Sequence, residues 1–179
     1  MSKRRDRELR TRRALRLVRR GQPKTVEEAE ALGVNLRKTG QGAFRTAYRI
    51  YGTNLLIKFP LQCKYEGCCT QHKSGGGSEG HVWHDREGKN HTRMEVKKIR
   101  ALLKFPMWKK HLPPVYYFNG RDGVIVTKFY PPSKRYVVDD GRNMLMGELV
   151  KVFCGVTLGD LTDDNVRVDK NLVICDLGY

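Results

Sequence analysis

The chain has 179 residues, enough for one compact domain or two small lobes. Lys and Arg outnumber Asp and Glu by 35 to 19, which gives a formal net charge of +16. No apolar run approaches the roughly 20 residues of a membrane-spanning helix, and the arginine-rich start lacks the apolar stretch of a signal peptide. These features argue against a membrane or exported protein. We expect a cytoplasmic protein whose five Cys are reduced, catalytic or metal-bound and not in disulfides.

Half of the net charge lies at the start of the chain. Residues 1–20 contain ten basic side chains against Asp6 and Glu8, a balance of +8. Such a block predicts an arm for a polyanion: a nucleic acid, an anionic membrane surface or an acidic protein. A solvated helix or a disordered tail explains the same residues equally well. Because few apolar residues interrupt the run, we expect no long buried helix here.

A short helix and two strands are expected next. Residues 25–28 have the form of a capping box, so a helix is predicted at 26–32 and ends at Gly33. The strand-like pattern that follows predicts antiparallel strands at 47–51 and 55–59.

The middle and end of the chain alternate polar and periodic segments. Residues 62–90 are polar and glycine-rich, and we expect an insertion or a flexible loop. Residues 92–104 have the clearest helical periodicity. The other expected elements are two strands, a helix and a final short strand, at residues 113–118, 123–130, 142–153 and 172–175.

A glycine-rich segment, Gly40-Gln41-Gly42-Ala43-Phe44, begins the strand region. Glycines let backbone amides approach a phosphate, and an aromatic residue at the tip can close over it. A hairpin turn that needs glycine for a positive φ is the alternative.

The most specific pattern lies near the carboxyl end. Gly159-Asp160-Leu161 is followed by Asn165, five residues after the Asp, and by Asp176-Leu177-Gly178 after a short apolar run. Together with the glycine-rich segment, this pattern resembles the catalytic and metal-binding loops of the protein-kinase-like superfamily. It is closest to the Gly-Asp-Leu form of atypical and small-molecule kinases. The resemblance covers residues 36–178.

The resemblance implies ATP and Mg²⁺ as cofactors. Phosphoryl transfer depends on groups that orient a hydroxyl and hold magnesium on the phosphates. By resemblance, Asp160 orients the acceptor hydroxyl, and Asn165 and Asp176 are the magnesium ligands.

A nucleotide site is implied in the amino-terminal part. By resemblance, Lys58 contacts the α and β phosphates and pairs with Glu95 of the following helix. A strand Lys that points to solvent is the alternative for Lys58. The alternative for Glu95 is a capping box at residues 92–95 that only begins the helix.

The resemblance also assigns residues around the phosphates and the adenine. Gly40, Gly42 and Phe44 would cover the phosphates, Thr127 would be the gatekeeper, and Phe129 would lie in the hinge beside the adenine. An ordinary strand leaving a sheet explains residues 124–130 as well.

The expected fold is therefore α+β: a kinase-like amino-terminal lobe, made of a twisted antiparallel sheet with one main helix, and a truncated, partly helical carboxyl-terminal lobe. We expect a basic arm and lead-in helix at 1–35, the amino-terminal lobe at 36–130 with an insertion at 62–90, and the hinge and truncated lobe at 131–179. The arm, a homodimer mate or a second protein is expected to complete the truncated lobe. Thr162 departs from the pattern, since Ser/Thr protein kinases usually carry Lys there.

A Cys/His cluster falls within the predicted insertion. Its spacings, such as Cys-x-x-x-His and His-x-x-His, could close a tetrahedral zinc site, although they match no standard zinc finger. A polar loop that collects His is the alternative. The candidate ligands are Cys63, Cys68, Cys69, His72, His81 and His84.

The expected function is that of an ATP-binding, kinase-like protein. It would transfer the γ-phosphate to a protein Ser/Thr hydroxyl or to a small-molecule hydroxyl, as in shortened kinases such as those of phages, which act in the host cytoplasm. An inactive pseudokinase scaffold is one alternative. A basic nucleic-acid-binding protein with a zinc-stabilised loop is the other.

Overall fold

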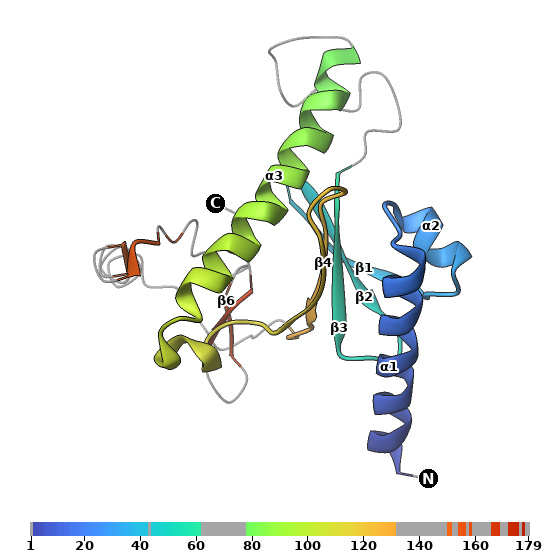
Figure 1. Ribbon diagram of the computed structural model, residues 1–179. Coiled ribbons are helices and arrows are strands. Elements are labelled where there is room, and N and C mark those ends of the chain that lie inside the picture. Colours follow the sequence, from blue (N-terminus) through green and yellow to red (C-terminus); the bar gives the residue numbers. More distant parts are fainter. Residues whose placement is uncertain are drawn as a thin grey trace. The chain divides into compact units, whose positions relative to one another are not determined.

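The computed structural model describes residues 2–42, 44–61, 78–131, 150–151, 154–156, 158, 166–168, 172–175 and 177. The described elements, in chain order, are α1 (Lys3–Gly21), α2 (Val26–Ala31), β1 (Leu36–Gln41), β2 (Arg45–Ile50), β3 (Leu55–Pro60), α3 (Ser78–Leu102), the 3-10 helix η1 (Pro106–Lys110), β4 (Val115–Asn119), β5 (Val124–Lys128), β6 (Val166–Val168) and β7 (Leu172–Ile174) (Figure 1). The expected α+β class is confirmed.

The chain divides into two compact units. The first comprises Met1–Thr92 with Tyr116–Thr127, and the second comprises Arg93–Val115 with Lys128–Tyr179. Among the described residues, no helix is both long enough and apolar enough to span a membrane.

The first unit is built on a five-stranded sheet with the order β1-β2-β3-β5-β4. Strands β1, β2 and β3 pair in antiparallel register. The strands expected at 47–51, 55–59, 113–118 and 123–130 are confirmed within two residues at every end, as β2, β3, β4 and β5. At the β2–β3 turn, Gly52 adopts a φ of 71°, a conformation that side chains other than glycine rarely take.

Alternate residues of the central strands form the first hydrophobic core. Leu55, Ile57 and Phe59 of β3 are buried in it, together with Val124 and Val126 of β5. This period of two arises because successive side chains of a strand point to opposite faces. One face of the sheet is therefore the core face.

Helix α1 packs its apolar side against this core. Ala14 is 7% exposed and Val18 is fully buried, and both belong to the first core cluster. The basic segment is therefore a long helix but, as expected, not a buried one: only Ala14 and Val18 are buried, and the solvated-helix alternative describes its charged side. Figure 1 shows α1 lying beside the sheet, with its first turns projecting past the end of the strands.

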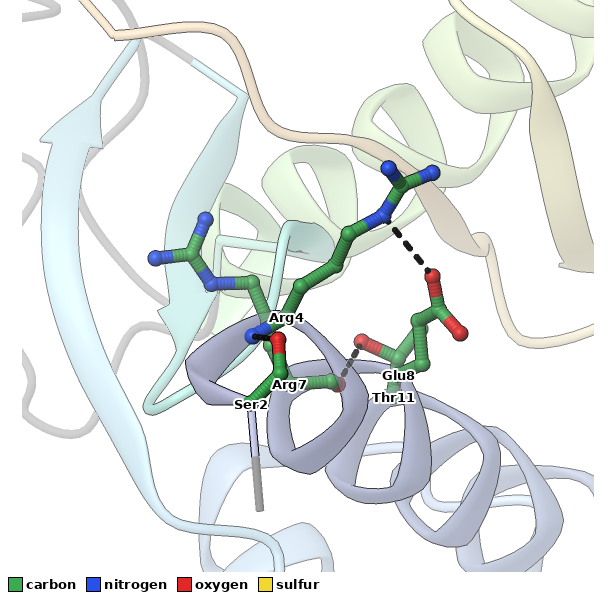
Figure 2. Close-up of polar contacts among 5 residues, drawn as sticks. All are labelled: Ser2, Arg4, Arg7, Glu8 and Thr11. Carbon is green, nitrogen blue, oxygen red and sulfur yellow. Dashed lines mark hydrogen bonds and ion pairs between the residues drawn. The ribbon is translucent and has the colours of Figure 1, made fainter.

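The start of α1 is fixed by local hydrogen bonds. Ser2 is the N-cap, and its hydroxyl accepts from the Arg4 amide at 3.3 Å. Figure 2 shows this cap beside two further bonds of the first turns: Arg4 Nε to the Glu8 carboxylate at 3.4 Å, and Thr11 Oγ1 to the Arg7 carbonyl at 2.8 Å.

Helix α2 confirms the predicted lead-in helix. The Thr25 hydroxyl caps it by accepting from the Glu28 amide at 3.1 Å, and Gly33 follows its end with a φ of 81°. Its Ala29 lies in the same core cluster as Val18. The predicted lead-in segment is therefore part of the first core.

Helix α3 is longer than the sequence predicts. It begins at Ser78 and not at residue 92, so the loop expected at 62–90 is helical from residue 78 onward. Tertiary contacts explain the difference. The Thr92 hydroxyl lies within hydrogen-bond distance of two carbonyls, those of Gly88 at 3.1 Å and Gly123 at 2.9 Å; sharing its one proton with Gly123 ties the helix to the β4–β5 turn.

The second unit has its own hydrophobic core. Ile99 and Leu102 of α3 cluster there with Ile174 of β7. Strands β6 and β7 form an antiparallel hairpin, and the Ile174 amide donates to the His111 carbonyl at 2.9 Å. The strand predicted at 172–175 is confirmed as β7. The helix predicted at 142–153 lies mostly outside the described residues, which include only 150–151 of it, both helical.

Candidate functional site

The sheet face opposite the first core carries the predicted phosphate-contacting residues. Gly40 of β1 pairs with Ala47 of β2, and Ala47 pairs with Lys58 of β3. Residues directly opposite each other in an antiparallel ladder lie on one face. Lys58 alternates with Ile57 and Phe59, which enter the core, so this row lies on the other face.

Thr127 lies on the same face as this row. Strand β5 is the neighbour of β3 in the sheet, and its Val124 and Val126 point into the first core. Thr127, one residue further along, therefore points to the opposite face, where it is 2% exposed. The fold of the first unit thus gathers Gly40, Lys58 and Thr127, which are far apart in the sequence, on one surface of the sheet.

The two glycines of the predicted loop are not required by the backbone. Gly33, Gly52, Gly123 and Gly155 have positive φ angles, whereas Gly40 and Gly42 do not. Among the described residues, a Cβ placed on Gly40 would meet no atom within 4 Å, and one on Gly42 would meet the Arg45 carbonyl alone, at 3.8 Å. The alternative of a hairpin turn that needs a positive φ is therefore wrong for these two glycines, and no described residue fills the space beside them.

Lys58 is buried. Its residue exposure is 5%, so the alternative in which it points to solvent is wrong. Lysine is almost never buried to this extent unless its ammonium contacts a polar or anionic partner, because taking the charge out of water is costly. The residue opposite it on β2 is the small Ala47.

Phe44 follows the glycines and stacks on helix α3. Its ring lies 4.4 Å from that of His91, with 22° between the planes. The Phe44 carbonyl accepts from the Leu61 amide at 2.7 Å. Gly88, one turn before His91, permits this close approach, since a Cβ there would lie 2.5 Å from the Phe44 carbonyl oxygen. The tip of the predicted loop is thus anchored to the helix.

The parts that Gly88 and His91 play were not predicted from the sequence. The available signal was a glycine within a segment that also carries a helical pattern. A glycine inside a helix lowers the stability of the helix, so its presence is usually explained by close packing against another segment. The segment's polar, glycine-rich composition outweighed that signal.

Glu95 and Phe129 belong to the second unit. Glu95 is fully buried on α3, and because the helix begins at Ser78, the capping-box alternative for residues 92–95 is wrong. Phe129 follows β5 directly and is half-buried. Beside it, the Lys128 amide donates to the Pro114 carbonyl at 3.2 Å, and the Lys128 ammonium lies 4.5 Å from the centre of the Tyr130 ring.

The predicted catalytic and magnesium residues Asp160, Asn165 and Asp176 lie outside the described residues. Residues that flank them are buried. Leu158 is 7% exposed and Leu177 is 1% exposed, and both belong to the second core cluster. Leu158 and Leu177 are therefore held in the second core.

The predicted zinc ligands also lie outside what the structure describes. Residues 62–77 contain Cys63, Cys68, Cys69 and His72, and of His81 and His84 only the helical backbone is described. Within the described residues, no group of three or more His, Cys, Asp or Glu side chains could hold a metal ion. The two Cys described there, Cys154 and Cys175, form no disulfide with a described residue.

Comparison with protein-family models and with curated protein sequences found no match to this chain.

Proposed function

We propose that the chain is an ATP-binding protein of the kinase-like type. The observation that carries the proposal is the sheet face on which Gly40, Lys58 and Thr127 lie together. An open glycine backbone beside a buried lysine suits a phosphate chain, because amides and an ammonium both favour anionic oxygens.

The order of the elements supports the proposal. A glycine-containing hairpin precedes the lysine strand β3, the helix with the buried Glu95 follows, and β5 ends beside Phe129. This is the order that the resemblance implies. The glycines support it further, because neither their backbone conformation nor an atom of a described residue explains the lack of a side chain at residues 40 and 42.

The proposed reaction is transfer of the γ-phosphate of ATP to a protein Ser/Thr hydroxyl or a small-molecule hydroxyl. Asp160 orients the hydroxyl, while Asn165 and Asp176 hold Mg²⁺. The setting is a cytoplasm, that of the host if a phage encodes the chain. Zinc bound by the Cys/His segment would stabilise that segment.

Thermal melting with Mg-ATP tests the nucleotide site. A ligand that binds only the folded protein stabilises it by about 2.7 kcal/mol at 100 times its Kd. Lys58→Met keeps the side-chain volume and removes the charge, and Gly40→Ala fills the open space. Both should reduce or abolish the ATP-induced rise in Tm.

Lys38→Met is the matched control. The substitution is chemically the same as Lys58→Met but lies in strand β1, at an exposed residue. Lys38 pairs with Tyr48, which alternates with Ala47, so Lys38 lies on the face opposite to that of Lys58. Its ATP-induced shift should equal that of the unmutated protein. An unmutated protein whose Tm does not move in millimolar Mg-ATP would refute the nucleotide site, and so would an equal loss in Lys38→Met.

ATP turnover separates the enzyme from the pseudokinase alternative. Asp160→Ala should abolish phosphate transfer and retain the ATP-induced shift, because this Asp acts on the acceptor and not on the nucleotide. A protein that is stabilised by ATP but turns none over would instead be a nucleotide-binding scaffold.

A further inference from the structure

We propose that the outward side of helix α1 docks the phosphate backbone of a nucleic acid, at a site separate from the proposed ATP site. We call this side the arginine face. Its members are Arg5, Arg12, Arg13, Arg16 and Arg20.

Helix geometry places these residues together. Each residue of an α-helix is rotated about 100° from the one before it. Ala14 and Val18 face the first core, and the arginine face is centred on the opposite side of the helix. All five of its residues are exposed. From Arg5 to Arg20 the face is about 22 Å long, at about 1.5 Å per residue.

The charge of this face is not neutralised by the part of the protein that the structure describes. Helix α1 has two acidic residues, Asp6 and Glu8, and Glu8 is paired with Arg4 (Figure 2). None of the five arginine side chains makes an ion pair or a hydrogen bond with a described residue. The face therefore presents a continuous positive surface.

The backbone under this face is held in place. Val18 is buried in the core, and Arg19 donates from Nη2 to the Tyr116 carbonyl at 3.0 Å. A helix that is already ordered does not lose the backbone entropy that a flexible arm would lose on binding. The arginines are thus presented on a preformed support.

The composition of the face favours nucleic acid over other polyanions. Nucleic-acid backbones are bound by repeated cationic contacts without any apolar centre. Protein interfaces have an apolar and aromatic centre, and the arginine face has only Leu9, which is 51% exposed, beside its charges. A membrane-surface helix inserts its apolar side, but that side of α1 is occupied by the core.

The test measures binding of labelled duplex DNA and of single-stranded RNA by fluorescence anisotropy at several salt concentrations. The variant carries Gln at all five positions of the arginine face. Its log-log salt slope on duplex DNA should be smaller by about 0.9 for each arginine that binds a phosphate. With three bound, affinity at about 0.1 M salt should fall at least about 100-fold.

A second five-residue variant keeps the total charge change equal. It carries Gln at exposed lysines outside α1 in the sequence, namely Lys24, Lys97, Lys104, Lys109 and Lys110. The fold loss of DNA affinity in this control should be less than a tenth of that in the arginine-face Gln variant. A third variant carries Lys at the five arginine positions and so keeps the charge. Its salt slope should equal that of the unmutated protein, and this expectation can be tested even if the Gln variant fails to fold.

Three results would overturn the proposal: equal loss in the two Gln variants, unchanged binding in the arginine-face variant, or tighter binding to phosphatidylserine vesicles or polyglutamate than to both nucleic acids. Lys58→Met should bind nucleic acid normally, so failure of the ATP site and failure of this site are distinguishable.

Deletion of residues 1–20 is unsuitable as a test, because it removes Ala14 and Val18 from the core.

Discussion

Individual glycines of the first unit serve different purposes. Gly88 lies where helix α3 meets the Phe44 backbone, whereas no described residue crowds Gly40. In Gly88→Ala the new Cβ would lie 2.5 Å from the Phe44 carbonyl oxygen and 2.9 Å from the Pro60 Cβ, so backbone must move.

We predict that Gly88→Ala destabilises the protein by about 1–3 kcal/mol, the usual cost of overpacking. Thermal or urea unfolding without ligand measures it. Gly40→Ala is the control and should change the free energy of unfolding by less than about 0.5 kcal/mol. Equal effects from the two alanines would contradict the close approach at Gly88.

Tyr117 carries a buried hydroxyl that is poorly hydrogen-bonded. Among the described residues its Oη has no partner of good geometry. Burial raises the pKa of Tyr117 more than hydrogen bonding to the side chain of nearby Asn119 lowers it, and that side chain donates to Asp122 at 2.8 Å. Removing such a group relieves a desolvation cost of about 1–3 kcal/mol. We predict that Tyr117→Phe is as stable as the unmutated protein at neutral pH, or more stable.

The same variant should change the response to alkaline pH. Burial, above all, raises the pKa of Tyr117 above its ordinary value of 10.0. As pH rises through this value, the unfolded tyrosine ionises first, so the unmutated protein loses stability that Tyr117→Phe keeps. Urea unfolding at neutral pH and above the ordinary tyrosine pKa measures the gap between the two proteins. A gap that does not widen at alkaline pH would show that Tyr117 is not buried.

At the scale of elements, α1 combines a structural side with a charged side. Val18 is fully buried, and Leu9 on the same helix is 51% exposed. Val18→Ala should cost about 2 kcal/mol of unfolding free energy, because two buried methyl groups are lost. Leu9→Ala should cost less than about 0.5 kcal/mol. Chemical denaturation of both variants tests whether α1 belongs to the core, and a small effect of Val18→Ala would contradict it.

At the scale of the whole molecule, two hydrophobic cores divide the described chain. Leu102 belongs to the second core and is fully buried. Leu102→Ala should destabilise its own unit by about 2–5 kcal/mol. Proteins open in cooperative segments that share packing. We therefore predict that Leu102→Ala accelerates amide hydrogen exchange, relative to the unmutated protein, more in β6 and β7 than in β1–β3. Uniform acceleration across both units would show instead that they unfold as one.

Local pattern by itself determined much of this protein. The strands β2 to β5, the capped helix α2 and the strand β7 were predicted from alternation, turn residues and capping chemistry, which act between close neighbours in the chain. The order of candidate nucleotide residues, from Gly40 through Lys58 to Thr127, could also be proposed from the sequence, since motif spacing is a property of the chain.

Tertiary structure alone decided three other features. Helix α1 packs against the core through Ala14 and Val18. This contact surface is small, and the many arginines of the segment lower its mean hydropathy so far that the contact is not apparent from the sequence. Helix α3 extends back to Ser78, with its polar, glycine-containing part in contact with the Phe44 backbone and the β4–β5 turn. The shared face of Gly40, Lys58 and Thr127 depends on strand order and register, which join residues far apart in the sequence and which no local pattern contains.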